Sequence, residues 1–163
     1  MDERLNYWRA APRGMAALRN LQAYLDDCGL EHGLLDLVKM RASQINGCAY
    51  CLDMHSKDAR AAGETEQRLY VLSTWREAPF YSDRERAALA WTEAVTHIAD
   101  GPIEDELYDE VRRHFDEKEI TDLTLAVIMI NGWNRLAIPF RTPPGAYQPS
   151  RSGGKSADAA LSP

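Results

Sequence analysis

The stretch DLVKMRASQINGCAYCLDMH, residues 36–55, decides the fold and holds most of the reactive side chains of this 163-residue chain. Apolar residues over 34–45 recur at helical spacing, and Gly47 is typical of the residue that ends a helix. A second helix is predicted over 48–62, directly after the Asn-Gly break. The stretch is therefore expected to form two consecutive helices with a tight turn between them.

Helical spacing continues on both sides of this stretch. Ser82 with Glu85 has the pattern of a capping box, and Gly101-Pro102 ends the helix that follows it. No segment alternates with period two for long enough to predict a strand. We expect an all-α bundle of about seven helices, formed by a single domain over residues 1–140. The other predicted helices begin near Met15, Thr65, Glu104 and Ile120.

Composition and charge exclude several classes of function. The formal net charge of −6 and the absence of a basic run disfavour binding to nucleic acid. Three cysteines are too few for a disulfide framework, and the N-terminus lacks the apolar segment of a secretory signal. The most apolar stretch, 123–133, is shorter than a membrane span. We expect a cytoplasmic protein with reduced cysteines and no membrane association.

Two segments differ from the rest of the chain. Residues 125–130 are apolar on every side of the last predicted helix, which indicates burial in the core or beneath a second subunit. We therefore expect a homo-oligomer. Residues 141–163 are rich in Pro, Gly and Ser and are predicted to form a disordered tail.

Cys48, Cys51 and His55 are expected to lie on one face of the helix that begins at Cys48. The start of a helix lowers the pKa of a thiol, and this spacing allows two sulfurs to form a disulfide. His55 lies one turn beyond Cys51 and can move a proton. Asp36, among apolar neighbours on the preceding helix, can have a raised pKa and act as a general base. Together these groups describe a dithiol redox site.

Other interpretations of the same residues remain open. A lone CxxC is also half of a zinc site, although no second ligand pair follows it in the sequence. Two buried, inert cysteines would give the same pattern. Trp133 and Asn134 follow the apolar run, and they either fix helix packing or line a pocket beside the cysteines.

The segments SQINGCAYCLDMH, LLDLVKMRA and INGWNRLAI resemble the carboxymuconolactone decarboxylase superfamily, in its AhpD-like alkylhydroperoxidase branch. The resemblance covers residues 12–140 and implies an all-α bundle that assembles into trimers or hexamers. Cys48, Cys51 and His55 match the family pattern, and the family's glutamate falls on Asp36. Tyr50 replaces a histidine of the characterised peroxidases and is a weaker proton carrier at neutral pH.

The resemblance implies a thiol peroxidase that reduces organic hydroperoxides and contributes to antioxidant defence. Cys51 would attack the peroxide, Cys48 would form the intramolecular disulfide, and a lipoyl- or thioredoxin-like dithiol protein would reduce it, without a bound cofactor or metal. The alternatives are a non-catalytic redox sensor or scaffold whose CxxC switches, and a lactone decarboxylase, which the CxxC disfavours because decarboxylating members lack it.

Overall fold

The computed structural model describes residues 2–149, and within this range the protein is entirely helical. The all-α prediction is confirmed, with eight α-helices and one short 3-10 helix, η1, in the described part of the chain. The elements are α1 (Tyr7–Ala10), α2 (Pro12–Asp26), α3 (His32–Asn46), α4 (Ala49–Ala61), α5 (Glu66–Tyr70), η1 (Leu72–Thr74), α6 (Asp83–Thr96), α7 (Asp105–His114) and α8 (Glu117–Phe140).

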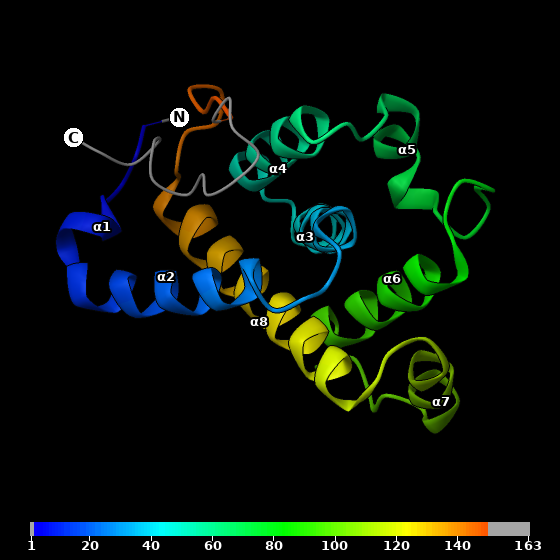
Figure 1. The fold of residues 1–163 in the computed structure, drawn as a ribbon. Coiled ribbons are helices and arrows are strands. Elements are labelled where there is room, and N and C mark those ends of the chain that lie inside the picture. The colour runs from blue at the N-terminus through cyan, green and yellow to red at the C-terminus, as the bar shows by residue number, and fades with distance from the viewer. Residues whose placement is uncertain (1, 150–163) are drawn as a thin grey trace.

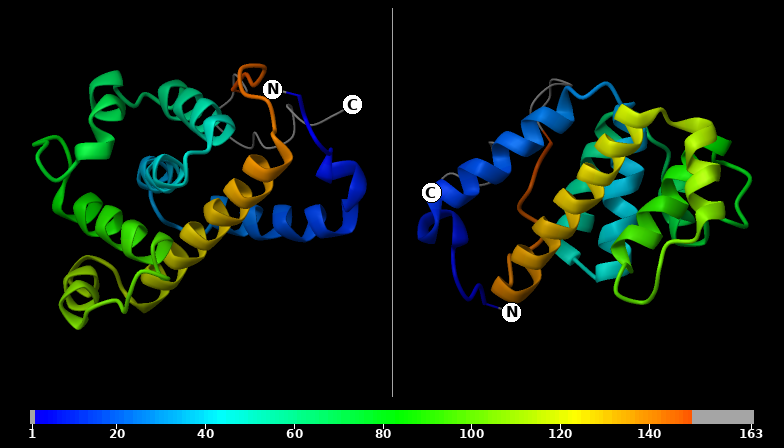
Figure 2. Two further views of the ribbon diagram at one scale, coloured as in Figure 1. Left: turned by 180° about the vertical axis from the view of Figure 1, so that it is seen from behind. Right: turned by 90° about the horizontal axis from the view of Figure 1, so that it is seen from below.

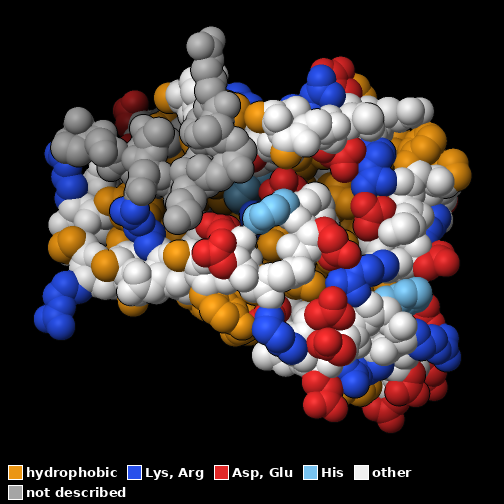
Figure 3. Space-filling model, viewed as in Figure 1, with side chains coloured by type: hydrophobic (Ala, Val, Ile, Leu, Met, Phe, Trp, Pro, Cys, Tyr) orange, Lys and Arg blue, Asp and Glu red, His pale blue; other side chains and the backbone are white. Residues whose placement is uncertain are grey.

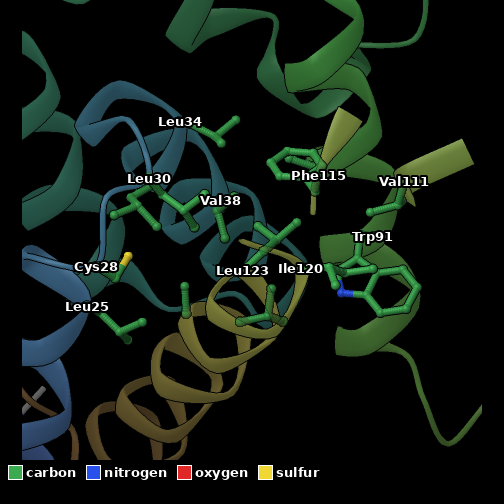
Figure 4. Packing of buried hydrophobic residues seen from close by; sticks show 14 of the residues in the cluster. Leu25, Cys28, Leu30, Leu34, Val38, Trp91, Val111, Phe115, Ile120 and Leu123 are labelled. Atoms are coloured by element: carbon green, nitrogen blue, oxygen red, sulfur yellow. The ribbon is translucent and has the colours of Figure 1, made fainter. Parts of the chain in front are cut away.

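The helix α3 lies at the centre of the bundle, where it packs against α8, α4 and α6 (Figures 1 and 2). One core cluster joins α3 to α2, α6, α7 and α8, and its side chains converge in Figure 4 from three sides on Leu123 and Val38. A second cluster joins the opposite side of α3 to α4, α5 and η1. Because α3 is buried on both sides, the residues at its end are held firmly in place.

Several helix boundaries follow the predicted signals. Gly47 has a φ of 69°, a left-handed conformation that glycine adopts without steric cost, and it ends α3. The capping box of Ser82 and Glu85 is present at the start of α6. No periodic pattern predicts the short helix α1, because its four residues are too few to show one.

The helix α8 begins three residues before the predicted start near Ile120. It continues through Pro139, which lies in its last turn, and its 24 residues are long and apolar enough to cross a membrane by length and composition alone. Core helices of soluble proteins pass the same test, and α8 packs here against α2, α3 and α6. Ile128, however, is 53% exposed, so one edge of α8 is uncovered in the single chain.

On the surface of the protein, charged side chains gather over α7 (Figure 3).

The segment after α8 corrects the predicted boundary of the disordered tail. Residues 142–149 run back over α4, and Tyr147 is buried. Lys57 donates hydrogen bonds to the carbonyls of Gly145 and Tyr147, and the Gly145 N–H donates to Asp53 at 2.9 Å. Composition alone indicated disorder, but these long-range contacts order the segment. The remainder of the predicted tail, 150–163, lies outside the described residues.

Candidate active site

The turn between α3 and α4 positions the two cysteines. Gly47 reverses the chain direction, and Cys48 then takes the N-cap position of α4 in an extended conformation. Its Sγ accepts the backbone N–H of Cys51 at 3.4 Å, as a capping side chain does. The predicted placement of the CxxC at a helix start is therefore present in the structure.

The sulfur atoms of Cys48 and Cys51 lie 2.6 Å apart and share a hydrogen bond. Both residues are only 1% exposed. The hydrogen bond between the two thiols, helped by the backbone N–H of Cys51, lowers the pKa of Cys48 to about 7 against the opposing effect of burial. The same pairing, followed by burial, raises the pKa of Cys51 above its usual value. Near neutral pH the site therefore favours negative charge on Cys48 over negative charge on Cys51.

Asn134, named from the sequence only as a possible pocket residue, lies beside the sulfurs. It is fully buried, and its side-chain amide lowers the pKa of both cysteines. Asn46 donates to Asn134 Oδ1 at 2.8 Å, and Asn134 Nδ2 donates to Ser43 Oγ at 3.1 Å. These bonds from the end of α3 fix the orientation of the amide, so its N–H group is held ready to stabilise negative charge on sulfur.

His55 lies on the buried side of α4, as predicted, but it is electrically neutral. Burial lowers its pKa to about 3, and the positive charge of Lys39 adds to this effect. Within residues 2–149, no hydrogen bond joins His55 to Cys51 or to Asp36, which differs from the predicted relay. His55 instead lines a cavity of about 10 Å³, room for about one water molecule.

That cavity adjoins the dithiol through shared walls. Trp133 and Ile130 line it and also belong to the cluster that contains both cysteines. Lys39, which the sequence reasoning did not single out, lines the cavity beside His55. Its position one turn after Asp36 is the signal that could have identified it. A neutral imidazole and an ammonium group thus line one small cavity that shares wall residues with the cysteine cluster.

Asp36 lies on α3 and contacts Lys39 rather than a cysteine. Its carboxylate is 3.5 Å from the Lys39 ammonium. Burial raises the pKa of Asp36, as expected from its apolar surroundings, and the charge of Lys39 opposes this rise. In this arrangement Asp36 does not line the cavity, and it affects the charge of the cavity through its contact with Lys39.

Aromatic residues cover the dithiol. Tyr50 and Trp133 pack against the cysteine cluster, and Trp8 stacks on Trp133 with ring centroids 5.6 Å apart. Burial raises the pKa of Tyr50 to about 12, so its phenol stays protonated at neutral pH. Sequence reasoning did not find Trp8 or its neighbour Tyr7, because both lie about forty residues before the CxxC and their contacts are set by the fold.

The described residues do not provide a metal site around these cysteines. Over residues 2–149, no group of three or more His, Cys, Asp or Glu side chains converges in a way that could hold a metal ion. His55 is the nearest imidazole in sequence to the CxxC, and its side chain lines the cavity instead. The zinc interpretation thus has no ligand set to support it in this region.

Comparison with known proteins supports the resemblance. The sequence pattern of the carboxymuconolactone decarboxylase family matches residues 8–94. The uncharacterised protein YdfG of Bacillus subtilis is 45% identical over 138 residues, which cover 85% of this chain and 94% of YdfG. A protein of unknown function from Agrobacterium tumefaciens, ATU0492, is 43% identical with a TM-score of 0.86, and the match covers 90% of this chain and 100% of that one.

Antioxidant defence as an AhpD protein has been suggested for ATU0492. An uncharacterised peroxidase-related protein from Silicibacter sp. TM1040 is 25% identical with a TM-score of 0.72, and the match covers 80% of this chain and 70% of that one. The family pattern, the relatives and the fold agree with one another. The chain belongs to the carboxymuconolactone decarboxylase family, in its AhpD-like branch.

Proposed function

We propose that this protein is a dithiol peroxidase that reduces organic hydroperoxides. The observation that carries the proposal is the pair of sulfurs 2.6 Å apart at the start of α4, in which Cys48 has a pKa of about 7. A thiolate is the nucleophilic form of cysteine, and a neighbouring thiol lets its oxidised form be resolved within the same chain. The suggested antioxidant role of ATU0492 agrees with this chemistry.

In the proposed catalytic cycle, two steps oxidise the cysteine pair to a disulfide, and a third step reduces that disulfide. The Cys48 thiolate attacks the terminal oxygen of ROOH, the O–O bond breaks, Cys48 becomes a sulfenic acid, and the RO oxygen takes a proton and leaves as ROH. The Cys51 thiol then attacks the Cys48 sulfur, which forms the disulfide and releases water. A dithiol donor reduces the disulfide by thiol exchange and is itself oxidised to a disulfide.

This order of attack reverses the one that the resemblance implies. The family comparison assigns the attack to Cys51, whereas the hydrogen bonds in this site favour negative charge on Cys48. Trapping with dimedone, which labels sulfenic acids, separates the two orders. We expect the label on Cys48 in a Cys51→Ser protein and only slow oxidation in a Cys48→Ser protein; the opposite pattern would restore Cys51 as the attacking residue.

A turnover assay tests the function itself. Purified protein is mixed with cumene hydroperoxide and a panel of dithiol donors, including dihydrolipoamide and a thioredoxin system. We expect continuous consumption of peroxide that is lost in Cys48→Ser and in Cys51→Ser. Cys28→Ser is the matched control, because Cys28 belongs to the core cluster of α2 and α3 and not to the dithiol site.

A redox sensor or scaffold is the second candidate, and the burial of both cysteines favours it because a switch needs no rapid access. A sensor would oxidise once and would not turn over with any donor in the panel.

We further propose a cytoplasmic location, where donors keep cysteines reduced, and a homo-oligomeric state. No bound cofactor or metal takes part in the proposed cycle.

A further inference from the structure

Two buried polar atoms near the dithiol, Trp8 Nε1 and Thr142 Oγ1, make no hydrogen bond of acceptable geometry. Most buried polar groups in folded proteins have a partner, so an orphaned pair needs an explanation. Both atoms lie beside the buried Tyr7 hydroxyl. Three polar groups from two distant parts of the chain thus meet in one place, and two of them make no hydrogen bond of acceptable geometry.

This place borders the cysteines. Trp8 stacks on Trp133, which packs against the cluster of Cys48 and Cys51. The backbone N–H of Thr142 donates at 3.0 Å to the carbonyl of Ala137, another member of that cluster. Thr142 and Trp8 therefore each contact a residue of the cysteine cluster, from opposite ends of the sequence.

Each of the three groups can donate a hydrogen bond. The indole N–H is a donor only, and the hydroxyl groups of Thr142 and Tyr7 can both donate. Burial raises the pKa of Tyr7, the neighbouring Thr142 and Trp8 side chains oppose the rise, and negative charge on the dithiol adds to it. The Tyr7 phenol therefore keeps its proton at neutral pH, and it lies close enough to both sulfurs to respond to their charge.

The end of α8 holds these donors in place before any ligand arrives. The Arg4 N–H donates at 2.9 Å to the carbonyl of Phe140, and the ring of Tyr7 packs against that of Phe140 with centroids 5.9 Å apart. The segment before α1 is thereby fastened to the last turn of α8, from which Thr142 follows. Fixed donors stabilise developing charge better than donors that must reorient.

We propose that Tyr7, Trp8 and Thr142 form the pocket that binds the departing oxygen of the hydroperoxide. This inference rests on the proposed function. As the Cys48 thiolate attacks the terminal oxygen, the O–O bond breaks and the electron pair moves to the RO oxygen. Trp8 N–H and Thr142 O–H donate to that oxygen, which takes the proton of the Tyr7 hydroxyl and leaves as ROH. The tyrosinate then recovers a proton from water.

The test compares two reactions of the same thiolate. Oxidation by cumene hydroperoxide requires an oxygen to depart, whereas alkylation by iodoacetamide releases iodide and needs no oxygen pocket. Both rates are measured in single turnover on Cys48 by peptide mass spectrometry, in Tyr7→Phe, Trp8→Phe and Thr142→Val. Each variant removes one donor; Tyr7→Phe and Thr142→Val keep the shape of the side chain, and Trp8→Phe keeps an aromatic ring facing Trp133 but a smaller one. Tyr108→Phe, an exposed phenol on α7, is the matched control.

We expect peroxide oxidation to fall at least about tenfold in each single variant and about 100-fold or more in Tyr7→Phe/Trp8→Phe, with alkylation changed less than about twofold. Equal losses in both reactions would overturn the inference, because they would show a general effect on the thiolate or its accessibility. Unchanged oxidation in all three variants, with an active wild-type protein, would overturn it and leave the proposed function intact. A wild-type protein that is alkylated but never oxidised by peroxide would remove the proposed function and this inference together.

Discussion

The hydroxyl of Tyr147 donates a hydrogen bond of 2.6 Å to the carboxylate of Asp58, a residue 89 positions earlier in the chain. Burial raises the pKa of Asp58, and the bond from Tyr147 opposes that rise. The contact fastens the segment after α8 onto α4, the helix that carries the dithiol. It makes residues 142–149 part of the folded domain.

Tyr147→Phe should lower the free energy of unfolding by about 2 kcal/mol, because it leaves a half-buried carboxylate without its donor. Urea denaturation at pH 7 measures the change. Tyr70→Phe, which removes an exposed bond to Glu66, is the control and should change stability by less than about 0.5 kcal/mol. Deletion of residues 145–163 should be at least as destabilising as Tyr147→Phe; no effect of the deletion would mean that the segment is not anchored in solution.

The alkylation rate of Cys48 should follow the fraction of thiolate. With a pKa of about 7, the rate with iodoacetamide should rise tenfold per pH unit below pH 7 and level off above it. The same peptide in urea-unfolded protein is the control and should show a midpoint at about pH 8.5. Equal midpoints in the folded and unfolded protein would remove the argument for Cys48 as the attacking residue.

His55 should make stability depend on pH. Its pKa is about 3 in the folded protein against about 6.5 when unfolded, so the unfolded state binds a proton first as the pH falls. Stability should therefore decrease from pH 7 to pH 5 by about 2 kcal/mol through this residue alone. The decrease should disappear in His55→Gln and persist in His97→Gln, an exposed control. Parallel curves for wild type and His55→Gln would show that His55 is not buried in the neutral form.

Asp36 should have little direct part in peroxide reduction. Because its carboxylate contacts Lys39 and not a thiol or His55, Asp36→Asn should keep the single-turnover oxidation rate within about threefold of wild type. Asp36→Glu, which restores the family's residue, provides the comparison. A loss on the order of 10²–10⁴ in a stably folded Asp36→Asn protein would instead establish a general base.

The exposed edge of α8 should mediate self-association. Ile128 is 53% exposed in the single chain, and Ile128→Asp should convert an oligomer into an 18 kDa monomer in light scattering. Ile98→Asp places the same charge on another exposed isoleucine, just beyond the end of α6, and should leave the assembly unchanged. A wild-type protein that is monomeric at every concentration would refute the expectation.

Local signals in the sequence were sufficient for most of the fold. Gly47, the capping box of Ser82 and the CxxC each act within a few residues, so their positions could be predicted without knowledge of the tertiary structure. The ordered segment 142–149 could not, because its composition resembles that of a disordered tail and its anchors lie on α4.

The same distinction applies to the candidate site. Periodicity placed Cys48, Cys51 and His55 on one helix. It did not reveal that His55 is neutral, that Asn134 lowers the pKa of both cysteines, or that Trp8 and Thr142 contact residues of the cysteine cluster. Those relationships arise from helices that are distant in sequence and meet only in the folded chain.

The near-complete burial of the dithiol has a consequence for the kinetics of its reduction. A sulfur that is 1% exposed can meet a bulky donor only during brief openings of the aromatic cover. The apparent rate constant for a globular donor would then be the opening equilibrium constant multiplied by the intrinsic rate of thiol exchange. A slender dithiol on a flexible arm needs a smaller opening than a folded protein does. The cover would act as a steric filter, selecting electron donors by their width before their redox potential has any influence.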